Sequence, residues 1–321
     1  MNENMSENIR EKMRAVVIKQ YGNNDVVNCI VIDRPEVGDD EVLVKVHAAG
    51  VNPVDWKIRD GAGERMGMTF PIHLGSELSG TIVKLGHGVT SLKQGDAVYG
   101  IVKSGAFADY AVVKAADMVI KPAQLDFIHA AAVPLASLTA WQAMFDLAKL
   151  ASGQRLLITG GSGGVGSMAI QLAKAAGAHV TAMASGRNEE FIRSLGADAF
   201  IDYTAQPFEQ VVRDMTQDMD VVFDTVGGDT FKRALSTLKK GGFLVTSVAF
   251  PKDEGLQHGV DVARVQCKPD SGQLESISQL LEAGKLKTHI ETVLPLSKIK
   301  EAFELSRSGR TRGKIVLSLD V

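Results

Sequence analysis

The sequence predicts an α/β protein of two domains, in which a β-rich barrel or sandwich accompanies a doubly wound parallel sheet. Five β-branched or alternating runs crowd residues 13–120. After about residue 126, short apolar strands alternate with helices, which is the pattern of βαβ units. The first of these strands leads into a glycine-rich turn of the G-x-G-x-x-G type.

Length and composition set the bounds of this prediction. The 321 residues suffice for two ordinary domains, and 45% hydrophobic residues is normal for a globular protein. A net charge of −3 gives no reason to expect nucleic acid or an anionic membrane as a partner, and no apolar run is long enough to span a bilayer. Cys29 and Cys267 form no C-x-x-C pair, which favours a reducing, cytoplasmic location. Residues 1–12 are polar and partly acidic, so we expect a mobile tail rather than a targeting signal.

The N-terminal region contains the β-rich runs, each separated from the next by Gly, Pro or Asp turns. They read AVVIKQY, EVLVKVHAAGV, SGTIVKLG, DAVYGIV and DYAVVK. Two helices then follow at about 127–132 and 135–145, separated by Pro134.

The next region contains strands at about 155–159, 178–183, 199–202, 220–224 and 243–248. Helices are expected to begin near Gly164, Asn188, Pro207 and Asp229. After Pro269 we expect a helix at 274–283, a strand at 290–294, a helix at 297–306 and a strand at 314–319. This last segment could extend the parallel sheet, but we favour its return to the N-terminal domain.

The glycine turn is the strongest local motif. Gly161 permits a tight turn, Gly163 lets the backbone approach a pyrophosphate, and Gly166 lets the helix pack closely on the strand. Ser162, Gly164 and Val165 complete the turn, and the helix beginning near Gly164 offers free N–H groups to an anion. A purely structural glycine turn is the alternative.

Several stretches give the chain a resemblance to a known superfamily: VHAAGVNPVDWKIRDG, FPIHLGSELSGTIVKLGHGVTSLKQGDAVYG, LGADAFIDY, DVVFDTVGG and RGKIVLSL. Together with the glycine turn, they resemble the medium-chain dehydrogenase/reductases, and within them the zinc-free quinone oxidoreductase (ζ-crystallin-like) and enone reductase branch. The resemblance implies a GroES-like β-barrel catalytic domain from residues 1–125 and 270–321. It also implies a Rossmann dinucleotide-binding domain from residues 126–269.

The resemblance also implies that no metal is bound. Where zinc-dependent members carry a first Cys ligand, this chain has residues around Asn52, and Ser76 replaces the His of their Gly-His-Glu. The cysteine-rich lobe for structural zinc is absent between Tyr99 and Gly105. A zinc site needs three or four N, S or O ligands, so we expect none.

The cofactor is expected to be NADPH. No acidic residue stands at the end of the second strand, where NAD-selective sites hold the ribose 2′-OH. Ser185 and Arg187 could instead bind a 2′-phosphate, and Tyr203 matches a position near that phosphate in relatives. A solvated Arg187 is the alternative. The remaining candidate contacts are Thr139, Val226, Gly227, Ser247, Val248 and Ala249.

Catalysis is assigned by the resemblance to Asn52, Asp55 and Lys57, which would flank the nicotinamide. Quinones and α,β-unsaturated carbonyls need no metal, because developing charge delocalises onto oxygen. Our hypothesis is that Lys57 stabilises an enolate oxygen or relays a proton, with Asp55 fixing its position; an exposed, inactive Lys57 is the alternative.

Other functions remain open. A catalytically silent NADPH-binding structural or regulatory protein and a zinc-free alcohol or aldehyde oxidoreductase fit the same motifs. A short-chain dehydrogenase would need Tyr-x-x-x-Lys on a helix, and the two such pairs, Tyr99/Lys103 and Tyr110/Lys114, lie in β-like runs. The resemblance also implies a homodimer, for which the candidate contact is the sheet edge within residues 243–267.

Overall fold

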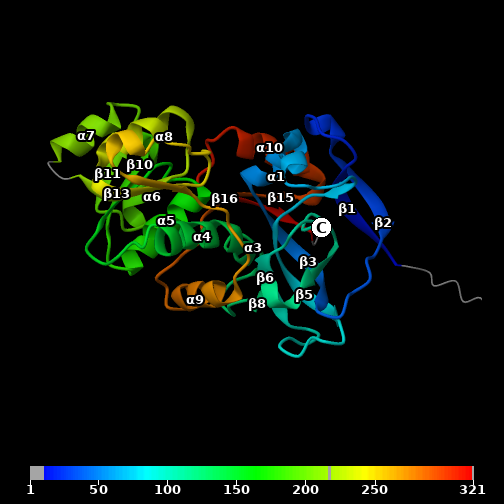
Figure 1. The fold of residues 1–321 in the computed structure, drawn as a ribbon. Coiled ribbons are helices and arrows are strands. Elements are labelled where there is room, and N and C mark those ends of the chain that lie inside the picture. Colours follow the sequence, from blue (N-terminus) through cyan, green and yellow to red (C-terminus); the bar gives the residue numbers. More distant parts are fainter. Residues whose placement is uncertain (1–10, 216–217, 320–321) are drawn as a thin grey trace, which may run out of the picture.

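The computed structural model describes residues 11–215 and 218–319, which fold into two lobes that lie side by side (Figure 1). One lobe holds the N-terminal strands together with the last strands of the chain, and the other holds the parallel sheet. Within the described residues, no helix is long and apolar enough to cross a membrane.

The N-terminal lobe contains two sheets. The three-stranded sheet has the order β2-β1-β4, and the seven-stranded sheet has the order β15-β16-β3-β5-β6-β8, with β7 also paired to β3. Their bounds are β1 Lys12–Ile18, β2 Asn28–Asp33, β3 Glu41–Val51, β4 Ile72–His73, β5 Glu77–Leu85, β6 Ala97–Ile101, β7 Tyr110–Lys114, β8 Met118–Ile120, β15 Ile290–Pro295 and β16 Lys314–Ser318. All five predicted runs are strands here, whereas β2, β4 and β8 were not predicted.

The C-terminal segment returns to this lobe, as expected. β16 pairs antiparallel with β3, placing Val316 opposite Gly50, and β15 pairs parallel with β16. Between them, α10 (Ile299–Arg307) buries Ala302 and Phe303 in the same core as β3. The prediction of a tail over residues 1–12 is wrong at its last residue, because Lys12 begins β1. Residues 1–10 lie outside the part of the chain that the structure describes.

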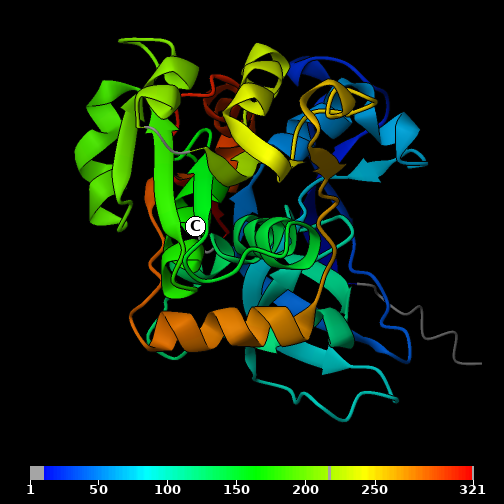
Figure 2. The same cartoon turned by 60° about the vertical axis from the view of Figure 1, so that its left-hand side comes forward.

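The second lobe is a six-stranded parallel sheet with the order β11-β10-β9-β12-β13-β14. Its strands are β9 Arg155–Ile158, β10 His179–Ala184, β11 Ala199–Asp202, β12 Met219–Asp224, β13 Leu238–Thr246 and β14 Asp261–Arg264. Its helices are α5 Gly164–Ala175, α6 Glu189–Ser194, α7 Phe208–Asp214 and α8 Gly228–Ala234, and they cover the sheet as βαβ crossovers require (Figure 2). The short edge strand β14 was not predicted.

Helices α3 (Phe127–Ala131), α4 (Pro134–Trp141) and α9 (Ser271–Glu282) lie where the two lobes meet. Leu274 and Ile277 of α9 share one apolar core with Leu138 of α4 and with Leu156 of the parallel sheet. The Tyr99 hydroxyl in β6 lies 2.6 Å from Ser278 Oγ in α9, so the helix also contacts the N-terminal lobe.

Two short helices that the sequence analysis left out follow β3: α1 (Pro53–Lys57) and α2 (Gly63–Arg65). The start of α1 is fixed locally. Pro53 occupies the first helical position, where its missing N–H costs nothing, and the Asn52 N–H donates to Asp55 Oδ2 at 2.7 Å. The fold therefore delivers Asn52, Asp55 and Lys57 on one rigid turn at the end of a buried strand.

Candidate active site

The glycine turn joins β9 to α5 as predicted, with one correction. The positive φ of the turn belongs to Gly160 (+65°) rather than to Gly161. A Cβ on Gly166 would lie 2.3 Å from the Gly160 carbonyl oxygen, so only glycine allows the helix to pack this close. A Cβ on Gly163 would meet nothing closer than 3.5 Å, which leaves its backbone open to a ligand.

The turn is attached to the other lobe by its own backbone. The Gly313 N–H donates to the Ser162 carbonyl oxygen at 2.8 Å, and Gly163 and Gly313 form a parallel β-bridge. A Cβ on Gly164 would lie 2.7 Å from Lys314 Cδ. The segment before β16 therefore runs directly along the predicted pyrophosphate site, a contact that nothing in the local sequence pattern indicates.

The ends of β12 and β13 meet beside the turn. The buried Asp224 carboxylate accepts hydrogen bonds from Thr159 Oγ1 (2.9 Å) and Thr246 Oγ1 (2.8 Å), and from the Gly227 N–H. Thr246 Oγ1 in turn accepts from the Val248 and Ala249 N–H groups. The predicted Val226, Gly227, Ser247, Val248 and Ala249 thus lie together at the carboxyl edge, held by Asp224 and Thr246, which sequence reasoning missed.

The ends of β10 and β11 carry the predicted phosphate contacts. Arg187 Nη2 donates to the Arg310 carbonyl oxygen at 3.1 Å, and Arg312 Nη2 donates to the Arg187 carbonyl oxygen at 3.2 Å. These three arginines line one groove of about 730 Å³. Arg310 and Arg312 are distant in sequence and were not predicted.

Ser185 and Tyr203 complete this rim. Ser185 Oγ accepts from Asn188 Nδ2 at 3.1 Å, and the Tyr203 side chain is 54% exposed. An acidic residue does approach the rim from the third strand, since a Cβ on Gly186 would lie 2.4 Å from Asp202 Oδ2. Its other oxygen, Oδ1, accepts hydrogen bonds from Thr204, and these bonds lower the pKa of Asp202.

A buried polar cluster lies between the lobes and contains Asn52, one of the three predicted catalytic residues. Glu77 Oε1 accepts from Asn52 Nδ2 (2.8 Å) and from Lys314 Nζ (2.7 Å), while Lys314 Nζ also donates to Asn52 Oδ1 at 2.5 Å. Glu77 Oε2 accepts from the Leu135 N–H at the start of α4. The side chains of Glu77 and Lys314 are 0% and 5% exposed. One carboxylate therefore joins β5, α1, α4 and β16.

Glu77 and Lys314 were missed as site residues, although each leaves a signal. Each is the first residue of a strand whose next positions are buried, so a charged side chain without a partner would be costly there. The signal identifies a buried charge but not its partner, because 237 residues separate the two in sequence.

Asp55 is fully buried and does not hold Lys57 in place. Its Oδ1 accepts from Ser76 Oγ at 2.9 Å and its Oδ2 from the Asn52 N–H. Burial raises the pKa of Asp55 to about 7, against the smaller lowering effect of these hydrogen bonds. The hypothesis that Asp55 fixes Lys57 is therefore wrong: Asp55 fixes the loop and Ser76.

Lys57 and Thr139, two further predicted site residues, differ in the environment of their side chains. Lys57 is half-buried, and burial first, then the charge of Arg264, lowers the pKa of its ammonium. Thr139 Oγ1 donates to the Leu135 carbonyl oxygen one turn back at 2.6 Å, so its hydroxyl proton is engaged within the helix.

The described residues contain no cluster of three or more His, Cys, Asp or Glu side chains able to hold a metal ion. His47 Nε2 instead lies 3.1 Å from Thr81 Oγ1, and His47 stacks on Phe127. Cys29 and Cys267 are free thiols.

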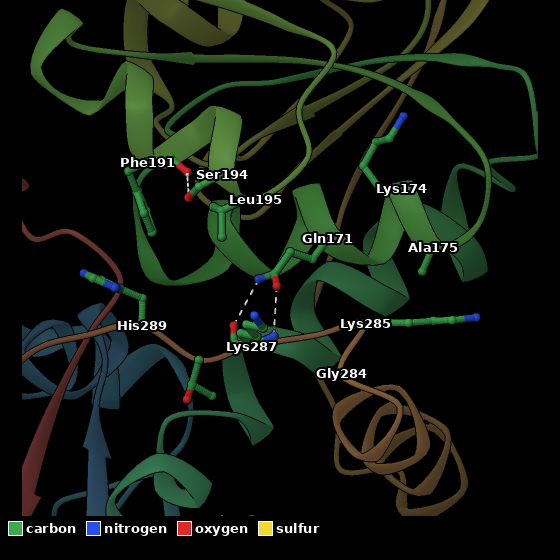
Figure 3. A pocket seen from close by; sticks show the side chains of 11 residues that line it. Gln171, Lys174, Ala175, Phe191, Ser194, Leu195, Gly284, Lys285, Lys287 and His289 are labelled. Carbon is green, nitrogen blue, oxygen red and sulfur yellow. Dashed lines mark hydrogen bonds between the residues drawn. The ribbon is translucent and has the colours of Figure 1, made fainter.

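A second groove, of about 760 Å³, lies away from these residues, between α5, α6 and the segment 284–289 (Figure 3). Gln171 crosses its floor, donating to the Lys287 carbonyl oxygen at 3.0 Å and accepting from the Lys287 N–H at 2.8 Å. None of the predicted site residues lines it.

The two lobes, the glycine turn and the site between them define a member of the medium-chain dehydrogenase/reductase superfamily. Family models match residues 38–123 as an alcohol dehydrogenase GroES-like domain and residues 195–317 as a zinc-binding dehydrogenase domain. Within the superfamily, the chain belongs to the quinone oxidoreductase branch, and it is an NAD(P)H-dependent oxidoreductase by its relatives.

Three relatives support this placement. The mitochondrial NAD(P)H oxidoreductase RTN4IP1 of Danio rerio is 35% identical, over 97% of this chain and 92% of its own length. The chloroplastic NADPH-dependent alkenal/one oxidoreductase of Arabidopsis thaliana is 34% identical, over 96% of this chain and 80% of its own length. The solved quinone oxidoreductase of Coxiella burnetii is 32% identical with a TM-score of 0.89, over 96% of this chain and all of its own.

Proposed function

We propose that this protein uses NADPH, without zinc, to reduce quinones or α,β-unsaturated carbonyl compounds. The observation that carries the proposal is the buried cluster of Asn52, Glu77 and Lys314. The Lys314 ammonium bonds the Glu77 carboxylate beside Asn52, which by the resemblance stands near the first zinc ligand of zinc-dependent members, and the ammonium would repel a cation bound there. Conjugated acceptors suit a site without a Lewis acid.

The residues present fit a dinucleotide. The open backbone at Gly163 and the first turn of α5 would hold the pyrophosphate, and the ends of β12 and β13 border the nicotinamide end. NADPH, when bound, supplies a hydride. Arg187, Arg310 and Arg312 support a preference for NADPH over NADH, because guanidinium groups suit a 2′-phosphate.

The roles of the chain's own residues follow from their contacts. Asn52 is fixed by Glu77 and Lys314, so its amide presents one orientation toward the crevice. Lys57, with its lowered pKa and half-buried ammonium, is suited to stabilise the developing oxyanion or deliver a proton to it. The closed site excludes water and orients the acceptor.

The test is NADPH oxidation with an enone, the saturated ketone of the same skeleton and a simple quinone, with NADH as the control cofactor. Turnover of the enone or the quinone but not of the saturated ketone supports the proposal. Turnover of the saturated ketone favours an alcohol or aldehyde oxidoreductase. NADPH binding with no turnover of any acceptor favours the silent cofactor-binding protein.

The proposal also includes an oligomeric state and a cellular location. The edge strand β14 pairs only with β13 within the described sheet, so we propose a homodimer that continues the sheet across two copies of β14. Light scattering that gives a monomer would overturn it. We also propose a cytoplasmic location, which cell fractionation would test, although two of the three relatives compared above carry organellar names.

A further inference from the structure

The carboxyl end of the edge strand β14 carries a cation that the site described above does not use. Arg264 is the last residue of β14, and it pairs with Thr246, which holds the loop beside the nicotinamide end. Parallel sheets bind ligands at this edge of the strands. Arg264 therefore lies at the edge of the sheet where a ligand is expected to bind.

The Arg264 guanidinium lacks a partner of opposite charge. Its Nε is buried and has no hydrogen-bond partner among the described residues, and none of the carboxylates in that part of the chain forms an ion pair with it. Arg34 has the same kind of unpaired Nε, but its guanidinium bonds Glu11. A buried donor without an acceptor is costly, and a bound ligand would remove that cost.

An aromatic ring holds the guanidinium in place. The Arg264 Cζ lies 4.1 Å from the centroid of the Phe250 ring, and Phe250 is 70% exposed. Stacking on a ring fixes the plane of a guanidinium and leaves its edge for hydrogen bonds. Because the ring is largely exposed, a small rotation of Phe250 would open the Nε edge to a ligand.

A second cation lies near Arg264 in the other lobe. Lys57, at the end of α1, lies close enough that the charge of Arg264 lowers the pKa of its ammonium. Figure 2 shows the gold segment that contains β14 beside the blue helices that follow β3. Two like charges that lie near each other gain from an anion bound beside one of them.

We propose that Arg264 forms a subsite for a carboxylate, so that the preferred acceptors are conjugated carbonyl compounds bearing a carboxylate. The carboxylate binds side-on to Nε and one Nη of Arg264, and this orients the carbonyl toward Lys57. This inference rests on the proposed function for its acceptor class. It adds a charge to the substrate that neither quinones nor simple alkenals carry.

The experiment compares trans-4-oxopent-2-enoate with its methyl ester, using the full chain and NADPH. We expect the wild type to favour the carboxylate in kcat/KM by about tenfold or more, in line with one charge-assisted bidentate contact. Arg264→Met abolishes the preference by lowering kcat/KM for the carboxylate only, and Arg264→Lys restores part of it. Arg213→Met, which removes an exposed arginine of α7, leaves both values unchanged.

The contrary results are equally specific. Equal kcat/KM for acid and ester in the wild type, or an equal loss of both in Arg264→Met, overturns the subsite. A matched phosphonate that outcompetes the carboxylate overturns the choice of carboxylate and assigns the site to phosphorylated acceptors. Phe250→Leu, which removes the stacking ring, is expected to weaken the preference about threefold.

The failure of the proposed function is separable from the failure of this inference. If neither acceptor is turned over, calorimetry with the NADP⁺-loaded protein compares 4-oxopentanoate with its methyl ester. Tighter binding of the acid by the wild type, lost in Arg264→Met, keeps the carboxylate subsite while the reductase proposal fails. Equal binding overturns the subsite.

Discussion

The buried cluster between the lobes and the arginine rim at the ends of β10 and β11 use charge in opposite ways. In the cluster, Glu77 and Lys314 are almost completely enclosed and bond each other at 2.7 Å. At the rim, Tyr203 is more than half exposed and Arg187 bonds only a backbone carbonyl oxygen. Charge in the cluster fixes the protein's own geometry, whereas charge at the rim is available to a ligand.

The difference has an energetic origin. Removing one member of a buried pair leaves the other without solvent or partner, so the cost appears in the free energy of unfolding. Removing an exposed arginine changes folding little, since water replaces its contacts. We therefore expect variants of the cluster to lose stability and variants of the rim to lose cofactor affinity.

The largest effect is expected for Lys314→Met. It leaves the Glu77 carboxylate buried beside Asn52 without a countercharge, which costs about 3–5 kcal/mol of unfolding free energy. Urea denaturation monitored by fluorescence measures it. The control Lys298→Met breaks an exposed pair with Glu301 and is expected to cost less than about 1 kcal/mol.

The double variant Lys314→Met, Glu77→Gln sharpens this test. Because it removes both charges, it should recover part of the stability that Lys314→Met loses. A double variant that is less stable than Lys314→Met would mean that Glu77 stabilises the fold without its lysine, through Leu135 and Asn52.

Asp55→Asn is expected to change the pH dependence of stability. In the wild type the folded pKa of about 7 lies above the unfolded value of 3.8, so the folded chain binds the proton more tightly. This contribution is fully present below about pH 4 and is lost as the pH rises to about 7, which amounts to about 4 kcal/mol. Asparagine carries no charge: its Oδ1 can accept from the Asn52 N–H while its Nδ2 donates to Ser76 Oγ, which reverses the direction of that second hydrogen bond.

The measurement is denaturation of both proteins between pH 4 and 8. We expect the difference in stability between Asp55→Asn and the wild type to move in favour of the variant as the pH rises. A constant difference would mean that Asp55 is ionised throughout and that its bonds to Ser76 and Asn52 outweigh its burial.

Substitutions at Gly166 and Gly163 test two separate roles of the turn, namely helix packing and the approach of a ligand. Gly166→Ala would place a Cβ 2.3 Å from a backbone oxygen, and we expect a loss of about 1–3 kcal/mol in stability. Gly163→Ala meets no protein atom closer than 3.5 Å, so it should fold normally and bind NADPH more weakly. Equal stability losses would contradict this division.

The smallest effect is expected at the rim. Arg187→Gln should raise the Kd for NADPH about tenfold, leave that for NADH within about twofold, and leave stability unchanged. Titration of the protein's fluorescence with each cofactor measures it. A parallel loss for both cofactors would show that Arg187 acts on the loop, through its bond to Arg310, rather than on a phosphate.

Local sequence patterns were sufficient to predict much of the fold. The alternation of apolar strands and helices predicted the parallel sheet, and Gly161, Gly163 and Gly166 located its turn, because both depend on residues close in sequence. Short or irregular elements, such as β14 and α1, were missed because they contain too few residues to show the hydrophobic periodicity of a strand or helix.

The sequence by itself determined the two-domain α/β architecture, the glycine turn and the superfamily to which they point. Only the tertiary structure decided which charges meet. It brought Lys314 and Glu77 together from 237 residues apart, turned Asp55 toward Ser76 instead of Lys57, and placed Arg264 near enough to Lys57 to lower the pKa of its ammonium. A strand or turn follows from neighbours along the chain, but the partner of a buried or crevice charge depends on which distant segments the fold packs beside it.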